Sequence, residues 1–331
     1  MPHLKVYSPK FISRFLKTRP GETKAGEKIQ FISRLEELSK SEAKYVIFGI
    51  PEDIGVRANY GKPGAASVWN AFLEAFLNFQ HNDFLSSENL VLLGEINCSA
   101  EMEKASNLDF SDPNYYVKLG EMVEAIDEVV SAVVKAIIAE GKVPVIIGGG
   151  HNNAFGNIKG ASEAFGKPIN VLNIDAHTDL RKLEHRHSGN GFSYAREKGF
   201  LDKYVIFGLQ ENYTPQYIFE EMEAAAEVKY SLFRNLNNGD ENAIFEEQLG
   251  FVSEGNFGLE VDCDAIAGFP SSAISPSGFT LDEVRNFIGM AGKRQNCSYL
   301  HLCEAIATKD YPTGKSLSFL VYEFVKNNAH A

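Results

Sequence analysis

Short runs of apolar residues alternate with amphipathic segments along most of the chain. The apolar runs are nearly continuous, as in strands that are covered on both faces. They lie at residues 44–50, 89–95, 143–149, 168–174, 203–209, 256–262 and 297–303. Between them, apolar residues recur at spacings of three and four, which predicts helices. The predicted helices span residues 115–140, 214–226, 280–292 and 314–327. Strands that alternate with helices indicate a mainly parallel sheet with helices on both faces.

The chain contains no linker rich in proline, glycine or serine that would divide it. We therefore expect one α/β domain over residues 41–331, preceded by an N-terminal extension over residues 1–40. The first 24 residues are basic and mildly amphipathic. They lack the continuous apolar stretch and the small-residue cleavage site of a secretory signal.

The composition and net charge of the chain limit the classes of molecule that it is expected to bind. The chain has 331 residues, of which 44% are hydrophobic, and a formal charge of -12. Nucleic acid and anionic membranes both require a basic surface, so neither is an expected partner. No apolar run is long enough to span a bilayer. The four cysteines (Cys98, Cys263, Cys297 and Cys303) are far apart and form no CxxC pair. These features predict a soluble cytoplasmic protein without disulfides.

Potential metal ligands follow three of the predicted strands, where the carboxyl ends of a parallel sheet bind ligands. They are His151 after the triple glycine 148–150, then Asp175, His177 and Asp179, and finally Asp262 and Asp264. Two histidines and four carboxylates suit a pair of divalent ions, with carboxylates free to bridge. The absence of thiolates here disfavours structural zinc. Manganese fits the oxygen-rich set best, while iron, nickel and cobalt stay open.

Each cluster has a simpler interpretation. The glycines could form only a tight turn or a phosphate-binding loop, although GxGxxG and GxxxxGK[ST] are absent. His151 could start a helix, and Asp262 and Asp264 could cap a turn. The coincidence of three such clusters at the ends of strands of one sheet favours the metal hypothesis. Four ionised carboxylates that converge without a cation would repel one another strongly.

The motifs GGGH (148–151), DAHTD (175–179) and DCD (262–264) resemble the signatures of the ureohydrolase superfamily, which includes arginase, agmatinase and formiminoglutamase. The similarity covers about residues 44 to 310. It implies a three-layer α/β/α fold and two manganese ions that serve hydrolysis of a guanidino or formimino group. It also implies a homo-oligomer, a trimer or a hexamer.

The resemblance further implies two ligand sets. The first metal would be bound by His151, Asp175, Asp179 and Asp262. The second would be bound by Asp175, His177, Asp262 and Asp264. Asp175 and Asp262 would then bridge the two ions.

Several residues resemble the formiminoglutamase branch. Phe192 stands where arginases have a histidine, and Arg181 follows DAHTDL as in the DLR of formiminoglutamases. The segments 55–65 and 148–156 are also similar to that branch. Departures are Asn152 in place of an acid, Glu260 where a small residue is common, and GNGF in place of GTPF. These departures bear on the substrate more than on the metal site.

The substrate-contacting residues predicted from this resemblance are Arg181, Arg57, Ser188, Asn190 and Phe192. The arginines would bind substrate carboxylates, because a guanidinium binds a carboxylate through two parallel hydrogen bonds. Each residue has an alternative role. The arginines could form surface ion pairs, Ser188 and Asn190 could stabilise turns, and Phe192 could simply pack.

The predicted reaction is hydrolysis of N-formimino-L-glutamate to glutamate and formamide, a step of histidine degradation. Glu304 would orient the cationic formimino group, and Asp179 or Asp264 would pass a proton to the departing nitrogen. Glu304 could instead be an acid at a helix start. Two alternative functions are release of urea from arginine, agmatine or another guanidino compound, and a non-catalytic role. All six ligand positions are filled, which disfavours the non-catalytic role.

Overall fold

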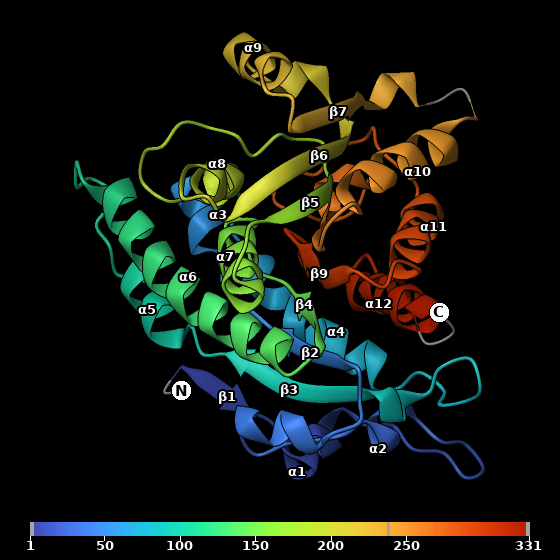
Figure 1. Ribbon diagram of the computed structural model, residues 1–331. Coiled ribbons are helices and arrows are strands. Elements are labelled where there is room, and N and C mark those ends of the chain that lie inside the picture. The colour runs from blue at the N-terminus through green and yellow to red at the C-terminus, as the bar shows by residue number, and fades with distance from the viewer. Residues whose placement is uncertain (1–2, 237–238, 329–331) are drawn as a thin grey trace.

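The computed structural model describes residues 3–236 and 239–328, and nine strands in these ranges form one sheet (Figure 1). The strands are β1 (Leu4–Val6), β2 (Tyr45–Gly49), β3 (Leu90–Ile96), β4 (Val143–Ile147), β5 (Ile169–Ile174), β6 (Leu201–Leu209), β7 (Val228–Leu232), β8 (Phe257–Asp262) and β9 (Cys297–Cys303). Their order in the sheet is β1-β3-β2-β4-β9-β8-β5-β6-β7. Neighbouring strands are parallel, except that β1 runs antiparallel to β3.

Helices cover both faces of the sheet, which confirms the predicted three-layer α/β/α fold (Figure 1). One face packs against α4 (Val68–Phe76), α10 (Glu241–Val252), α11 (Leu281–Gly292) and α12 (Thr313–Asn328). The other packs against α3 (Ile54–Ala58), α5 (Ser99–Ser106), α6 (Tyr115–Ala139), α7 (Asn153–Phe165), α8 (Gly191–Glu197) and α9 (Gln216–Ala224). Two one-turn helices, α1 (Pro9–Ile12) and α2 (Ala25–Lys28), lie near the N-terminus.

Local signals in the sequence fix where some helices begin and end. Helix α11 starts at a capping box, in which the Thr280 hydroxyl accepts a hydrogen bond from the Glu283 backbone N–H. The Glu283 carboxylate in turn accepts one from the Thr280 backbone N–H. Helix α7 ends at Gly166, whose φ of 67° is a left-handed conformation that glycine adopts without strain.

All seven predicted strands and all four predicted helices are present, with bounds that differ by a few residues. The sequence analysis did not predict β1 and β7. Strand β7 lies at an edge of the sheet and only its first residue, Val228, is buried. Strand β1 has three residues. A search for continuous apolar runs finds strands that are covered on both faces and therefore misses these edge strands.

The order of the strands determines where the candidate residues meet. Strands β4, β9, β8 and β5 are consecutive neighbours at the centre of the sheet. Ile147 of β4 pairs with Leu302, which also pairs with Val261, and Val261 pairs with Ile174. The four strands therefore end at the same level. The residues that follow them lie together at one edge, although they are far apart in the sequence.

The first residues of the chain belong to the sheet. β1 pairs with β3, and the close approach places a Cβ built on Gly94 only 2.0 Å from the Lys5 carbonyl oxygen, so only glycine fits there. The buried Tyr7 hydroxyl accepts a hydrogen bond from Trp69 Nε1 at 3.0 Å and donates one to Glu95. Part of the predicted N-terminal extension is therefore attached to the sheet. The domain boundary at residue 40 stays a prediction.

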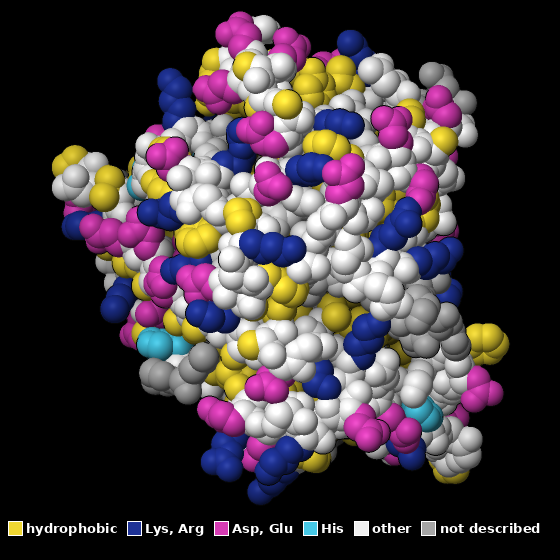
Figure 2. Space-filling model, viewed as in Figure 1, with side chains coloured by type: hydrophobic (Ala, Val, Ile, Leu, Met, Phe, Trp, Pro, Cys, Tyr) yellow, Lys and Arg dark blue, Asp and Glu magenta, His cyan; other side chains and the backbone are white. Residues whose placement is uncertain are grey.

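Within residues 3–236 and 239–328, no helix has both the length and the apolar character of a membrane span. The four cysteines are buried and their thiols are free. On the face shown in Figure 2, acidic and basic side chains intermingle and apolar side chains form small groups.

Replacing Tyr7 with phenylalanine tests the attachment of the N-terminal segment. The substitution leaves the buried Trp69 N–H without its acceptor, and we expect the free energy of unfolding to fall by about 1–3 kcal/mol. The measurement is urea unfolding followed by tryptophan fluorescence. Tyr60→Phe is the matched control, because Tyr60 is 71% exposed and its loss of a hydroxyl should cost about 0.5 kcal/mol or less. Equal stabilities of the two variants would contradict this account.

Candidate metal centre

The two DxH and DxD segments end their strands with the same turn. The Asp175 carboxylate accepts a hydrogen bond from the His177 backbone N–H at 2.7 Å. The Asp262 carboxylate accepts one from the Asp264 backbone N–H, also at 2.7 Å. An aspartate that accepts from the N–H two residues later stabilises a tight turn. Both turns keep the first and third side chains of the motif at the same edge of the sheet.

His151 enters this edge from the glycine loop after β4. Gly148 and Gly149 adopt φ values of 86° and 78°, which side-chain-bearing residues rarely adopt. The His151 side chain is 1% exposed. Its Nδ1 atom lies 3.2 Å from Asp175, 2.9 Å from Asp179 and 3.2 Å from Asp262. Three carboxylates from two strands therefore converge on one ring nitrogen.

His177 lies beside a second pair of carboxylates. Its Nδ1 atom is 3.5 Å from Asp175 Oδ1 and 3.9 Å from Asp264 Oδ2. Asp175 directs its other oxygen, Oδ2, toward His151. The Asp175 carboxylate thus lies between the two histidines, which is the position expected of a bridging ligand. The Tyr213 ring stacks on the His177 ring with 5.1 Å between their centroids.

Burial and the mutual repulsion of the carboxylates determine the pKa values in this cluster. Burial raises the pKa of Asp179 and of Asp262, and the nearby Asp175 carboxylate raises both further. Burial alone would also raise the pKa of Asp175, but the His151 and His177 imidazoles outweigh it and lower that pKa. Burial alone would lower the pKa of His177, whereas the Asp175 carboxylate raises it to about 10.

The donor set fits a divalent cation. One nitrogen of His151 and one oxygen each of Asp175, Asp179 and Asp262 lie within 4.8 Å of one another. Both ring nitrogens of the buried His151 lack a hydrogen-bond partner among the described residues. A buried polar atom normally has a partner. A cation at this point would satisfy the imidazole and relieve the repulsion between the carboxylates.

A pocket of about 200 Å³ opens onto this cluster. Its lining includes Asp179, Asp262, Asp264, His177, Glu304 and Arg181. Glu304, which follows β9, accepts a hydrogen bond from the His151 backbone N–H through Oε1 at 2.6 Å. Its Oε2 atom is buried and has no hydrogen-bond partner among the described residues. Burial, with a contribution from the Asp264 carboxylate, raises the pKa of Glu304 to about 8.

Two residues of the pocket adopt an unusual backbone conformation. Asp179 has a φ of 49° and Glu304 a φ of 60°, both in the left-handed region. A non-glycine residue there costs about 1–3 kcal/mol and persists where the surrounding structure imposes it. Such strain often accompanies functional sites. It aims the two carboxylates into the same pocket.

The structure separates the predicted substrate residues into two groups. Arg181 and Ser188 line the pocket. The other three predicted residues are not among its lining residues. Arg57 forms an ion pair with Asp53 at 3.0 Å. Asn190 accepts hydrogen bonds from the Arg186 side chain and the His187 backbone. Phe192 is fully buried.

Phe192 has a packing role instead of a contact with the pocket. Its ring stacks on Tyr204 at 4.4 Å and meets the His151 ring edge-on at 5.2 Å. The Phe192 side chain thus packs against the His151 ring. Residue type at position 192 can therefore influence the site without direct contact with a substrate.

Sequence reasoning missed several buried groups that support the site. Glu52 accepts hydrogen bonds from the Gly150 backbone and from the Asn152 and Asn153 side chains, at 3.1, 3.1 and 2.6 Å. Arg186 pairs with Asp127 at 3.0 Å and donates to the Asn152 carbonyl oxygen. These residues are separated from the motifs in the sequence and carry no spacing pattern, so only the fold brings them to the site.

Comparison with known proteins places the chain in a family. A family model described as the Arginase family matches residues 43–325. A formimidoylglutamase of Chromobacterium violaceum is 28% identical over 244 residues, which is 71% of each chain. A formimidoylglutamase of Lysinibacillus sphaericus is 24% identical over 304 residues, which is 88% of each chain.

Solved structures show the same fold. A Trypanosoma cruzi formiminoglutamase described with Mn²⁺ has a TM-score of 0.73 and 21% identity, covering 93% of this chain and 99% of its own. The formimidoylglutamase of Bacillus subtilis has a TM-score of 0.75 and 18% identity, covering 96% of this chain and 95% of its own. Since the family model spans most of the sequence, from the first long strand to the last helix, the chain belongs to the arginase family.

Proposed function

We propose that this chain is a hydrolase that cleaves the formimino C–N bond of N-formimino-L-glutamate to give glutamate and formamide, with two Mn²⁺ ions bound per subunit. The observation that carries the proposal is the polarity of the pocket. Its lining includes the acids Asp179, Asp264 and Glu304, of which the last two are buried, and the exposed cation Arg181. A substrate with one cationic amidine and carboxylates elsewhere matches this distribution of charge. The names of the relatives support the same substrate.

The ligand sets proposed for the two ions share Asp175 and Asp262. His151 and Asp179 would complete the first set, and His177 and Asp264 the second. When bound, two divalent cations at these positions would make hydroxide available near neutral pH and stabilise negative charge that develops in the reaction. Manganese suits a set of carboxylates and imidazoles without thiolates.

The remaining residues bind and orient the substrate. Glu304 Oε2 has no hydrogen-bond partner among the described residues and is available to bind the amidine N–H groups. Water adds to the formimino carbon, and the bond from that carbon to the glutamate nitrogen breaks. Asp179 or Asp264 passes a proton from the water to the departing nitrogen. The products are then formamide and glutamate, and the atoms balance.

Arg181 is the residue proposed to bind the substrate carboxylates. Its backbone N–H donates to the Gly189 carbonyl oxygen at 2.9 Å, and its carbonyl oxygen accepts from the Ser193 hydroxyl at 2.7 Å. The backbone at this position is therefore fixed, while the guanidinium is exposed at the pocket. Ser188 lines the same pocket and accepts a hydrogen bond from the Asn59 side chain at 3.1 Å.

The homo-oligomer that the family resemblance implies stays a prediction.

A product assay on the purified, manganese-loaded chain tests the proposal. Formiminoglutamate, arginine, agmatine and 4-guanidinobutyrate are offered separately, and formamide and urea are measured. We expect formamide from formiminoglutamate and no urea from the other three. Urea from a guanidino substrate would contradict the substrate while keeping the metal centre. No product from any of the four would contradict the proposed reaction.

Loss of a bridging ligand should abolish both metal pairing and turnover. Asp262→Ala removes a carboxylate shared by both proposed ligand sets, so we expect less than one tightly bound Mn²⁺ per chain and formamide release at background. Metal content is measured by atomic absorption after dialysis. Asp202→Ala is the matched control, since Asp202 is an exposed aspartate on β6. Turnover retained by Asp262→Ala would refute the ligand assignment.

Replacing Arg181 with alanine tests the binding of the carboxylates. Hydrogen bonds to charged groups contribute about 1.5–3 kcal/mol, so KM for formiminoglutamate should rise by about 10–100-fold with a smaller change in kcat. The KM of Arg181→Lys should lie between that of the unmodified chain and that of Arg181→Ala, because an ammonium cannot form the paired hydrogen bonds.

The control for this measurement is Arg196→Ala. Arg196 pairs with Glu227 at 2.6 Å at the surface and is not among the residues that line the pocket. The KM of Arg196→Ala should equal that of the unmodified chain. A KM that is unchanged in Arg181→Ala would remove this residue from the proposed site.

A further inference from the structure

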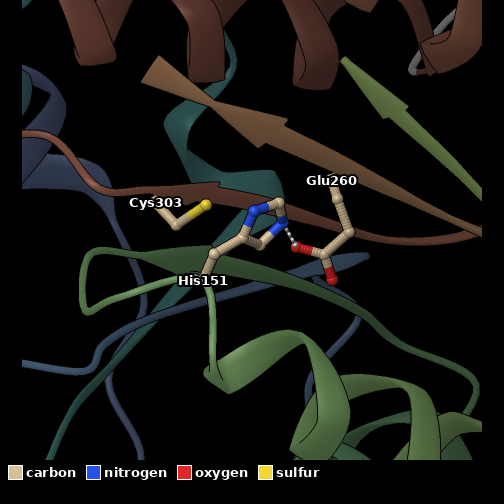
Figure 3. A group of neighbouring side chains, drawn as sticks. All are labelled: His151, Glu260 and Cys303. Carbon is tan, nitrogen blue, oxygen red and sulfur yellow. Dashed lines mark ion pairs between the residues drawn. The ribbon is translucent and has the colours of Figure 1, made fainter. Parts of the chain in front are cut away.

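Glu260 lies beside the His151 ring (Figure 3), next to its Nε2 atom, and it is not among the residues that line the pocket. It is fully buried on β8, and its Oε2 atom is 3.7 Å from His151 Nε2. The opposite ring nitrogen of His151, Nδ1, faces the carboxylates of Asp175, Asp179 and Asp262. The His151 imidazole thus lies between three carboxylates near Nδ1 and the single Glu260 carboxylate near Nε2.

A second histidine holds Glu260 in place. His301 is the register partner of Glu260 on the neighbouring strand β9, and its Nδ1 atom is 2.5 Å from Glu260 Oε2. The other ring nitrogen of His301 lies 3.2 Å from the Gly148 carbonyl oxygen. Both neighbours of His301 are acceptors, so its ring nitrogens are placed to donate to Glu260 or to the Gly148 carbonyl oxygen. Asn157 of α7 adds a donor 3.4 Å from Glu260 Oε1.

The hydrogen bonds from His301 and Asn157 offset the unfavourable free energy of burying the Glu260 carboxylate. An isolated carboxylate buried in a protein is strongly unfavourable, whereas a paired and hydrogen-bonded one is tolerated. His301 and Asn157 therefore give the buried carboxylate next to His151 defined hydrogen-bond partners.

We propose that Glu260, held by His301, is a positioning residue that fixes the orientation of His151 for the metal centre. The inference rests on the proposed metal site. A histidine that offers Nδ1 to a cation must carry its hydrogen on Nε2, and that hydrogen needs an acceptor. Glu260 Oε2 lies 3.7 Å from Nε2, which is longer than a hydrogen bond, and its carboxylate attracts this hydrogen electrostatically. It selects the ring orientation that directs Nδ1 at the three carboxylates and increases the basicity of the imidazole.

Cys303 does not compete for this role. Its thiol also lies beside His151 (Figure 3), and it donates to the Val261 carbonyl oxygen at a sulfur–oxygen distance of 3.6 Å. A thiol is a weak acceptor, and a carboxylate is a strong one. Cys303 therefore provides a control position that is equally buried and whose sulfur lies within 4.8 Å of the imidazole.

The test is calorimetric titration of the metal-free full chain with Mn²⁺. Glu260→Gln keeps the size of the side chain and an oxygen for His301 but removes the charge. We expect one of two binding constants to weaken by about 10–100-fold, as for other partners of metal-ligating histidines. The second constant should change by less than about threefold. Cys303→Ser should bind as the unmodified chain does.

A double-mutant cycle separates positioning from general damage. In a His151→Asn background the ligand that Glu260 orients is gone, so Glu260→Gln should no longer change Mn²⁺ affinity. Thermal unfolding of the metal-free variants checks the fold independently. Equal weakening of both constants, or an effect that persists in the His151→Asn background, would overturn the inference.

The remaining outcomes are also distinct. Equal loss of affinity in Cys303→Ser would place a metal among His151, Glu260 and Cys303 and overturn the positioning role. An unmodified chain that binds no Mn²⁺ would overturn the proposed metal centre together with this inference. An unmodified chain that binds two ions, with Glu260→Gln unchanged, would overturn the inference alone.

Discussion

Repulsion between carboxylates buried at one edge of the sheet is the constraint on which the site depends. Asp175, Asp179, Asp262 and Asp264 are held together by turns and by a sheet whose central strands end level. Burial and the neighbouring carboxylates raise the pKa values of Asp179 and Asp262. A cation bound among these carboxylates would offset their repulsion, so that metal affinity and folding would be linked.

Three buried ionisable side chains surround the carboxylate cluster, and each has hydrogen-bond or ion-pair partners. Glu52 gathers donors from the glycine loop, Arg186 anchors the segment after Asp179 through Asp127, and Glu260 lies behind His151. Each is a buried ionisable group with defined hydrogen-bond or ion-pair partners. Together they hold a loop, a segment and a ring that the backbone alone would leave free. Rigid support of this kind is what a site needs if its ligands are to stay aligned.

Much of this arrangement follows from local sequence. Continuous apolar runs predicted the seven strands covered on both faces, and the motifs at their ends predicted which side chains converge. Strands β1 and β7 were missed because edge strands need no such runs. His301 and Glu52 were missed because their partners lie across the sheet. Phe192 is not among the residues that line the pocket and packs on Tyr204 and His151, since a motif gives the position of a residue in the chain but not the direction of its ring.

The two edges of the sheet have a consequence for behaviour at high concentration. A long, flat, apolar edge strand offers unpaired backbone groups to other chains and promotes aggregation. Here the long apolar β3 is shielded by the three-residue β1, which runs against its direction. The opposite edge, β7, is partly exposed and carries Lys229. Removal of the first eight residues would uncover β3, and the damage would then appear as loss of colloidal solubility before any loss of the metal ligands.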